Sequence, residues 1–159
     1  MTGDGVRSGG KGDAAAISRL LERTMRDAWS AEMVAETLVH EGLAFVSESA
    51  SAGEVEGAVL VRGSSCEAEI LQLAVDPSRR RQGLGIRLLR EALAAITRAG
   101  AHVAWLEVRT SNLEARRLYQ RAGFLEVGSR PRYYRNGEDA VLMRKQLAFA
   151  SPGGEPETS

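Results

Sequence analysis

Apolar residues recur at two different spacings along the chain, and each spacing predicts one type of element. Helical spacing behind Asp13 predicts a first helix, and a second helix follows Ser30 as far as Leu38. The first of these stripes consists of Ile17, Leu20, Leu21 and Met25. Strand character follows in three segments that are separated by short turns with Gly or Ser: Leu43–Glu48, Gly57–Arg62 and Glu67–Val75.

The second half of the chain alternates between the two spacings. It predicts a long helix over Leu84–Arg98, a strand over His102–Val108, a helix over Asn112–Ala122 and a final strand pair, Phe124–Arg132 and Ala140–Lys145. This order predicts a single α/β domain with a mixed central sheet of about six to seven strands, about four helices and a right-handed parallel crossover. Residues 1–12 and 148–159 lack a periodic apolar pattern, so we expect flexible tails around an ordered domain at 13–147.

The composition excludes several classes of protein. Apolar residues make up 43% and charged residues 26% of the 159 residues, a balance typical of soluble globular domains. No segment resembles a membrane helix or the apolar core of a signal peptide. The single cysteine, Cys66, cannot form an intramolecular disulfide and is expected to be an inert thiol, and no Cys or His cluster has metal-ligand spacing. We therefore expect a cytoplasmic protein without a metal.

The net charge of zero conceals a strong asymmetry. Residues 1–78 carry six Lys or Arg and thirteen Asp or Glu, whereas residues 79–147 carry fifteen and six. The net charges of these two segments are therefore −7 and +9. This pattern favours two ligands of opposite charge, although solvated faces that segregate by chance would look the same.

The segment between the third strand and the long helix carries the clearest chemical signal. Three arginines, Arg79 to Arg81, precede Gly83 and Gly85, which open the helix. Glycines allow the backbone to approach a ligand, and a helix N-terminus offers unpaired N–H groups to an anion. The spacing fits neither a P-loop nor the Rossmann fingerprint. It indicates a pyrophosphate site; the alternative is a glycine-bearing turn beside a solvated basic run.

Arg80–Gly85 matches the Q/R-x-x-G-x-G/A motif with which GCN5-related N-acetyltransferases (GNAT) wrap the pyrophosphate of coenzyme A, and the chain resembles this family over 13–147. Later segments narrow the resemblance to RimI-like acetyltransferases of the N-terminal alanine of the eighteenth small-subunit ribosomal protein. Those segments are Trp105–Arg109, Ser111-Asn112, Leu118-Tyr119, Ala122–Phe124, Arg132–Tyr134 and Gly137–Met143. One departure is that the family begins with a strand. Here only Val6 and Arg7 lie between glycines, so the first strand should be short or absent.

The resemblance implies acetyl-CoA as co-substrate and a set of residues that bind it. Asn112 would contact the cofactor in the family pattern, but its place before a helix also predicts an N-cap. Leu73, Ala74 and Val75 would act through backbone N–H groups on a strand that separates from its neighbour. The remaining cofactor residues implied by the motif are Arg80, Arg81, Gln82, Gly83, Leu84, Gly85 and Ile86.

Two residues are candidates for the chemistry of acetyl transfer. Glu107 ends an apolar strand, where burial would raise its pKa toward that of a useful base; alternatively it reaches solvent or pairs with Arg109. Tyr119 lies on the buried stripe of a helix, which by itself predicts a core aromatic with a satisfied hydroxyl. The resemblance assigns Glu107 the role of base, through water, and Tyr119 the role of acid beside the coenzyme sulfur.

The acceptor side is indicated by three aromatic residues. Tyr133 and Tyr134 lie between the last two strands and would form a wall of a peptide groove, or else be exposed hairpin aromatics. Trp29 fits the same subgroup, but a helix-packing role is equally compatible with its position. The resemblance implies a basic N-terminal peptide of a small-subunit ribosomal protein as partner, with neither nucleic acid nor membrane bound directly. The acidic half, with Glu32, Glu36 and Glu41, could attract such a peptide.

These observations predict an acetyl-CoA-dependent N-terminal acetyltransferase that works by direct attack in a ternary complex, because no Cys or Ser is placed as a covalent nucleophile. One alternative is an acetyltransferase of the same fold that acts on a lysine, a polyamine or a small-molecule amine. Another is a coenzyme A-binding module without catalytic activity.

Overall fold

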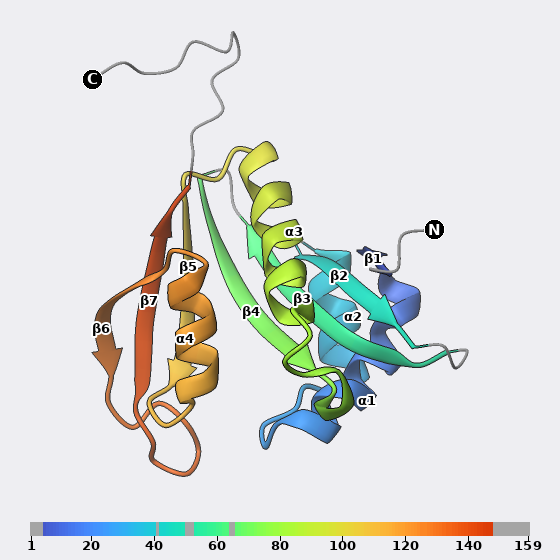
Figure 1. The fold of residues 1–159 in the computed structure, drawn as a ribbon, viewed down its shortest axis with the longest axis horizontal. Helices are drawn as coiled ribbons and strands as arrows, with labels where there is room; N and C mark the ends of the chain where they lie inside the picture. The colour runs from blue at the N-terminus through green and yellow to red at the C-terminus, as the bar shows by residue number, and fades with distance from the viewer. Residues whose placement is uncertain (1–4, 41, 50–52, 64–65, 148–159) are drawn as a thin grey trace, which may run out of the picture.

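The computed structural model describes residues 5–40, 42–49, 53–63 and 66–147. Seven strands form one sheet in the order β1-β2-β3-β4-β5-β7-β6, and only the pair β4 and β5 is parallel (Figure 1). The strands are β1 (Val6–Gly9), β2 (Gly42–Glu48), β3 (Val55–Gly63), β4 (Glu67–Val75), β5 (Val103–Arg109), β6 (Leu125–Arg130) and β7 (Ala140–Gln146). The helices are α1 (Ala14–Thr24), α2 (Ala31–Val39), α3 (Leu84–Arg98) and α4 (Leu113–Arg121), with short 3-10 turns at Lys11–Asp13 and Pro77–Arg79.

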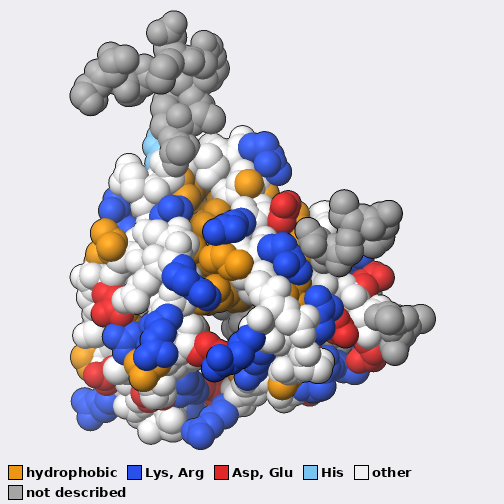
Figure 2. Space-filling model, viewed as in Figure 1, with side chains coloured by type: hydrophobic (Ala, Val, Ile, Leu, Met, Phe, Trp, Pro, Cys, Tyr) orange, Lys and Arg blue, Asp and Glu red, His pale blue; other side chains and the backbone are white. Residues whose placement is uncertain are grey.

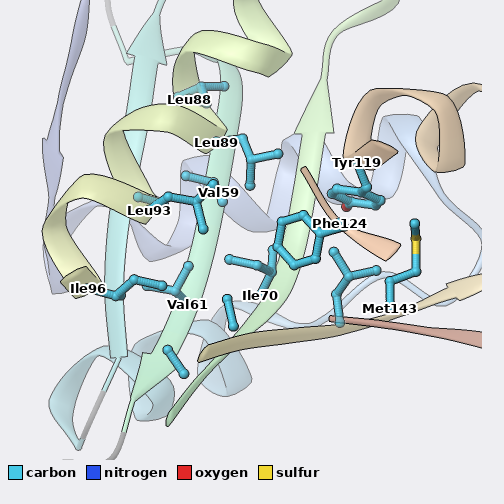
Figure 3. Packing of buried hydrophobic residues seen from close by; sticks show 14 of the residues in the cluster. Val59, Val61, Ile70, Leu88, Leu89, Leu93, Ile96, Tyr119, Phe124 and Met143 are labelled. Atoms are coloured by element: carbon cyan, nitrogen blue, oxygen red, sulfur yellow. The ribbon is translucent and has the colours of Figure 1, made fainter. Parts of the chain in front are cut away.

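Two helices cover each face of the sheet, and each face has its own apolar core. On one face α3 and α4 bury residues such as Leu88, Leu89 and Phe124 against β3, β4 and β5 (Figure 3). On the other face α1 and α2 bury Ile17 and Leu20 against β2 and β3. Each fully buried Leu, Ile or Phe side chain contributes about 1.5–3 kcal/mol relative to an exposed one, so the two cores fix both helix layers on the sheet.

The parallel strands β4 and β5 pair at one end only. Their register joins Glu67–Glu69 to Val103–Trp105 and then stops, although β4 continues to pair with β3 as far as Val75. A β-bulge in the β3–β4 ladder, between Leu60 and Val61, accompanies the separation. Bulges bend a strand and increase its local twist, which turns β4 away from β5. The sheet therefore opens in its middle, between the two strands (Figure 1).

The expected fold class is confirmed, with seven strands and four helices in the described residues. Ser30 caps α2 as expected, because its hydroxyl accepts a hydrogen bond from the Met33 N–H at 3.2 Å. Asp13 occupies the N-cap position of α1 without capping it by its side chain; its carboxylate instead accepts bonds from Arg7 and from the Gly10 N–H.

The expectation of a flexible tail over residues 1–12 is wrong for the part that the structure describes. Val6–Gly9 forms β1, which pairs with Ala44–Ser47 of β2 and thereby supplies the first strand of the sheet. Arg7 holds it in place, because its guanidinium bridges Asp13 and Glu48 at 2.8 and 2.5 Å. The expected tail at 148–159 and residues 1–4 lie outside the described residues. Across the described part of the chain, no helix is both long and apolar enough to cross a membrane.

Candidate active site

The loop from β4 to α3 is built to leave backbone donors open. Asp76 caps the 3-10 turn by accepting the Ser78 N–H at 3.0 Å, and Gly83 begins α3 in the left-handed region with φ +80° and no side-chain cap. The first N–H groups of the 15-residue helix α3 therefore have no capping side chain. Arg81 is also left-handed, at φ +63°, and its side chain is exposed. An uncapped helix start beside exposed arginines has the geometry and the charge that an anion site needs.

The arginines of this loop differ in what they can do. Arg79 pairs with Glu56 and donates to the Gln82 side-chain oxygen at 2.9 Å, so it holds the loop together. Arg80 is exposed and donates to the Val75 carbonyl at 3.2 Å. Arg80 and Arg81 are thus placed to meet a phosphate, whereas Arg79 has a structural role.

Gly85 is not required by packing inside the protein. A Cβ added there would lie 3.4 Å from the Leu118 Cδ2 and 3.6 Å from the Val75 Cγ2, which is ordinary contact. Gly57 of β3 differs, because its Cβ would come within 2.8 Å of Leu88 and 2.9 Å of Leu84. Gly57 therefore permits α3 to pack on the sheet, whereas the packing around Gly85 would accept a methyl group.

The open edge of β4 faces this loop. Leu73, Ala74 and Val75 pair with β3 on one side, and no described strand pairs with them on the other. Their backbone groups on that edge can therefore bind a ligand that enters between β4 and β5. Figure 2 shows the surface hollowed between α4 and the start of α3, with Lys and Arg side chains on both sides of the hollow.

Glu107 lies on the opposite face of the sheet from α3 and α4. Its carboxylate is 13% exposed, accepts a hydrogen bond from the Tyr133 hydroxyl at 2.7 Å and forms an ion pair with Arg130. It lines a pocket of about 480 Å³. The other lining residues include Arg62, Glu67, Glu69, Trp105 and Leu142. The alternative in which Glu107 pairs with Arg109 is wrong, because Arg109 pairs with Asp27 and Glu138.

Tyr119 of α4 lies in the core on the other face of the sheet. Its ring is 7% exposed and packs edge-on against Phe124, with centroids 5.8 Å apart (Figure 3). Its hydroxyl makes no hydrogen bond with any residue that the structure describes, so the expected satisfied core hydroxyl is absent there. Burial, and to a lesser degree the neighbouring Tyr134, raises the pKa of Tyr119 well above its usual value. It is therefore a neutral phenol across the physiological range.

Because Glu107 and Tyr119 lie on opposite faces of the sheet, a reacting group can meet both only where the sheet opens. That opening is the separation of β4 from β5. A carboxylate and a protonated phenol that both reached this opening could move one proton away from a nucleophile and another onto a leaving group.

Residues 14–124 match the sequence model of the Acetyltransferase (GNAT) family. The chain belongs to this family. The ribosomal protein bS18 alanine N-acetyltransferase of Escherichia coli is 40% identical over 86 residues, 52% of this chain and 58% of that protein. The N-alpha-acetyltransferase RimI of Mycobacterium tuberculosis is 49% identical over 80 residues, 50% of this chain and 49% of that protein. The chain therefore spans about half the length of the curated relatives that it matches.

The GNAT likeness extends over almost the whole chain in three dimensions. The crystal structure of the ribosomal-protein-S18-alanine N-acetyltransferase from Escherichia coli superposes with a TM-score of 0.81 at 31% identity, and covers 92% of this chain and 96% of that one. GNAT proteins use acetyl-CoA, and the uncapped start of α3 and the open edge of β4 fit such a cofactor. In the described residues, no three His, Cys, Asp or Glu side chains are grouped as a metal ion would need.

The remaining predicted site residues have separate places in the GNAT fold. Asn112 caps α4, because its side-chain oxygen accepts the Ala115 N–H at 3.1 Å. Tyr133 and Tyr134 meet edge-to-face, 5.1 Å apart, and burial raises the pKa of Tyr134 to about 12. The bond to Glu107 raises the pKa of Tyr133. Trp29 packs partly against the α1–α2 core and also lines a second pocket of about 280 Å³.

Sequence reasoning missed the arginines that surround Glu107. Arg130 of β6 pairs with Glu107, and Arg62 of β3 lines both pockets. No local motif marks either residue, since each meets the site only through strand pairing far along the chain. Of the acidic residues expected near the acceptor, Glu36 lines the second pocket, Glu32 is not among its lining residues, and Glu41 lies outside the described residues.

Proposed function

We propose that this protein transfers the acetyl group of acetyl-CoA to a protein N-terminal α-amine, with the N-terminal alanine of the eighteenth small-subunit ribosomal protein as acceptor. The observation that carries the proposal is the setting of Glu107. A largely buried carboxylate lines a pocket, is oriented by the Tyr133 hydroxyl, and lies beside the opening between β4 and β5. The likeness to the Escherichia coli and Mycobacterium tuberculosis enzymes supports the choice of acceptor.

Acetyl-CoA is assigned to the face that carries α3 and α4. The pyrophosphate would be held by the backbone N–H groups of four consecutive residues, Gly83, Leu84, Gly85 and Ile86. Three polar side chains would lie beside it, those of Arg80, Arg81 and Gln82. The open edge of β4 at Leu73–Val75 would bind the pantetheine amides and the thioester carbonyl. Backbone donors aimed at an oxygen that gains charge in the transition state supply a few kcal/mol. Asn112 would contribute from the start of α4.

The chemistry needs two proton movements, and the chain offers one group for each. The amine nitrogen attacks the thioester carbonyl, the carbon–sulfur bond breaks, and the acetyl group becomes an amide. Glu107 accepts the proton that the nitrogen loses, directly or through water. Tyr119 donates a proton to the departing sulfur. A free α-amine has a pKa near ~8, so only a modest base is needed at neutral pH.

The acceptor is assigned to the face that carries α1, α2 and the β6–β7 loop. Tyr133, Tyr134 and Trp29 would contact its first residues. Glu36 and Glu67 line the two pockets on this side and would attract a basic peptide, although Arg62 lines both pockets and pairs with Glu69. A ribosomal acceptor would place the reaction in the cytoplasm.

A panel of acceptors tests the proposal. Initial rates are measured with acetyl-CoA and a peptide that carries the N-terminal sequence of the ribosomal protein, the same peptide with a blocked N-terminus, lysine peptides, polyamines and small amines. We expect turnover only with the free N-terminus, and intersecting double-reciprocal lines. A preference for lysine or small amines would favour the alternative acceptors. Tight coenzyme A binding without turnover of any acceptor would favour a binding module.

A further inference from the structure

Arg109 lies at the end of β5 and contacts two loops that are far apart in the sequence. Its guanidinium pairs with Asp27 in the α1–α2 loop and with the Glu138 carboxylate in the β6–β7 loop at 3.1 Å. It also lies over the ring of Tyr134, 4.1 Å from the centroid. We call Arg109, Asp27 and Glu138 the Arg109 clamp. The side chains of Arg109 and Glu138 are only 21% and 18% exposed, so this contact is shielded from water more than a surface ion pair is, whereas Asp27 is 43% exposed.

The clamp is connected to Glu107 by a short series of hydrogen bonds. The backbone carbonyl of Glu138 accepts the N–H groups of Tyr133 and Tyr134, each at 3.1 Å. The Tyr133 hydroxyl in turn donates to Glu107 at 2.7 Å. Hydrogen bonds from Ser111, and then from Arg109, lower the pKa of Glu138, which is therefore ionised at neutral pH. Arg109 thus positions the residue on which both tyrosines depend.

Asp27 connects the same clamp to the other side of the acceptor face. It lies in the loop that leads to Trp29, and Trp29 lines the second pocket. The contacts of the clamp involve neither the start of α3 nor the open edge of β4, which are the places assigned to acetyl-CoA. A substitution of Arg109 should therefore weaken binding of the acceptor and leave binding of acetyl-CoA unchanged.

We propose that Arg109 is a positioning residue that sets the acceptor site by holding the α1–α2 and β6–β7 loops together. The planar guanidinium of Arg can donate hydrogen bonds to two carboxylates at once, which the single ammonium of Lys cannot do in the same geometry. The nature of the acceptor rests on the proposed function, but the role of the clamp does not, because it shapes the acceptor face for any amine.

The test is a comparison of the two Michaelis constants in Arg109→Gln. We expect the acceptor KM to rise about tenfold or more and the acetyl-CoA KM to stay within about twofold of wild type. The acceptor KM of Arg109→Lys should lie between that of wild type and that of Arg109→Gln. Arg135→Gln is the matched control, because Arg135 lies in the same loop and is exposed. Equal rises in both constants, or an unchanged acceptor KM, would overturn the proposal.

A double-mutant cycle tests whether Asp27 acts through Arg109. Asp27→Asn should raise the acceptor KM by about threefold or more. The double variant should have the same acceptor KM as Arg109→Gln alone. Fully additive effects would contradict a shared clamp. If the wild-type enzyme acetylates a lysine or small amine instead, the proposed function fails, and the same KM comparison with that amine still decides the clamp.

Amide hydrogen exchange gives a second measurement that does not depend on activity. Arg109→Gln and Asp27→Asn should both speed exchange in residues 25–30, and Arg109→Gln should also speed it in residues 131–139, whereas Arg135→Gln should not. Unchanged exchange in both loops of Arg109→Gln would show that they do not depend on the clamp.

Discussion

The hydroxyl of Tyr133 donates a hydrogen bond to the carboxylate of Glu107 at 2.7 Å, across 26 positions of sequence. This bond orients the proposed base from a loop rather than from its own strand. Arg130 holds the second carboxylate oxygen from β6. The position of the base therefore depends on the β6–β7 hairpin, and the hairpin on the Arg109 clamp.

Glu107→Gln should lower kcat by roughly 10²-fold or more with little change in coenzyme A binding. The amide keeps the shape of the side chain but cannot accept a proton. Raising the pH toward and above the pKa of the α-amine, near ~8, should partly restore the rate because more amine is then neutral without help. The measurement is a pH–rate profile from about pH 6 to about pH 10.

Glu126→Gln is the matched control for this variant. Glu126 lies on exposed β6 and pairs with Arg116 at 2.8 Å, outside both pockets. Its replacement should leave the profile unchanged. A Glu107→Gln profile identical to that of wild type would assign the base to another residue.

Tyr119→Phe should lower kcat without rescue at high pH, since hydroxide does not help to protonate a leaving sulfur. Stability should change by less than about 1 kcal/mol, because no described partner loses a hydrogen bond. The raised pKa of Tyr119 implies that wild-type kcat has no alkaline limb from this residue below about pH 10. Full kcat in Tyr119→Phe, measured beside the melting temperature, would reduce Tyr119 to a packing residue.

Gly85→Val should raise the KM for acetyl-CoA about tenfold or more, because a side chain bulkier than the Ala that the family motif accepts at this position would block the approach of the backbone to the pyrophosphate. Gly85→Ala is the matched control and should leave this KM close to that of wild type. Gly83→Val should raise this KM as Gly85→Val does, with added backbone strain at φ +80°. Gly53→Val controls for that strain, since Gly53 has φ +81° and open space around it. A wild-type KM for acetyl-CoA in folded Gly85→Val and Gly83→Val would contradict the phosphate site.

Acid should weaken the attachment of β1. The hydrogen bonds from Arg7, and then that from Gly10, lower the pKa of Asp13 below 3.8, against the opposing effect of burial. A lowered folded-state pKa contributes stability that is present above the unfolded-state value and is lost as the pH falls through the folded-state value. The melting temperature of Asp13→Asn should therefore lie below that of wild type at pH ~7, and the two should converge as the pH falls through the lowered pKa of Asp13. Glu22→Gln is the control, because Glu22 is an exposed residue of α1. Its melting temperature should equal that of wild type throughout this pH range.

Local patterns were sufficient for the elements that are stabilised by their own sequence. The bounds of α3, Leu84–Arg98, followed from its apolar stripe, and the cap at Ser30 followed from its side chain. The expected phosphate loop at Arg80–Gly85 has the left-handed Gly83 and exposed donors that its composition suggests. Helix periodicity and glycine conformation depend on near neighbours, so they are readable without the fold.

Tertiary structure decided the features that depend on distant partners. β1 has almost no strand pattern of its own and exists because β2 pairs with it and because Asp13 and Glu48 neutralise Arg7. The sequence indicated Glu107 and Tyr119 separately, but only the assembled sheet places them on its opposite faces and separates β4 from β5. The Asp27–Arg109 pair spans 82 positions, and no period or motif encodes a contact of that length. Contacts of this kind form when the sheet assembles, because loops that are independent in the sequence then share one edge.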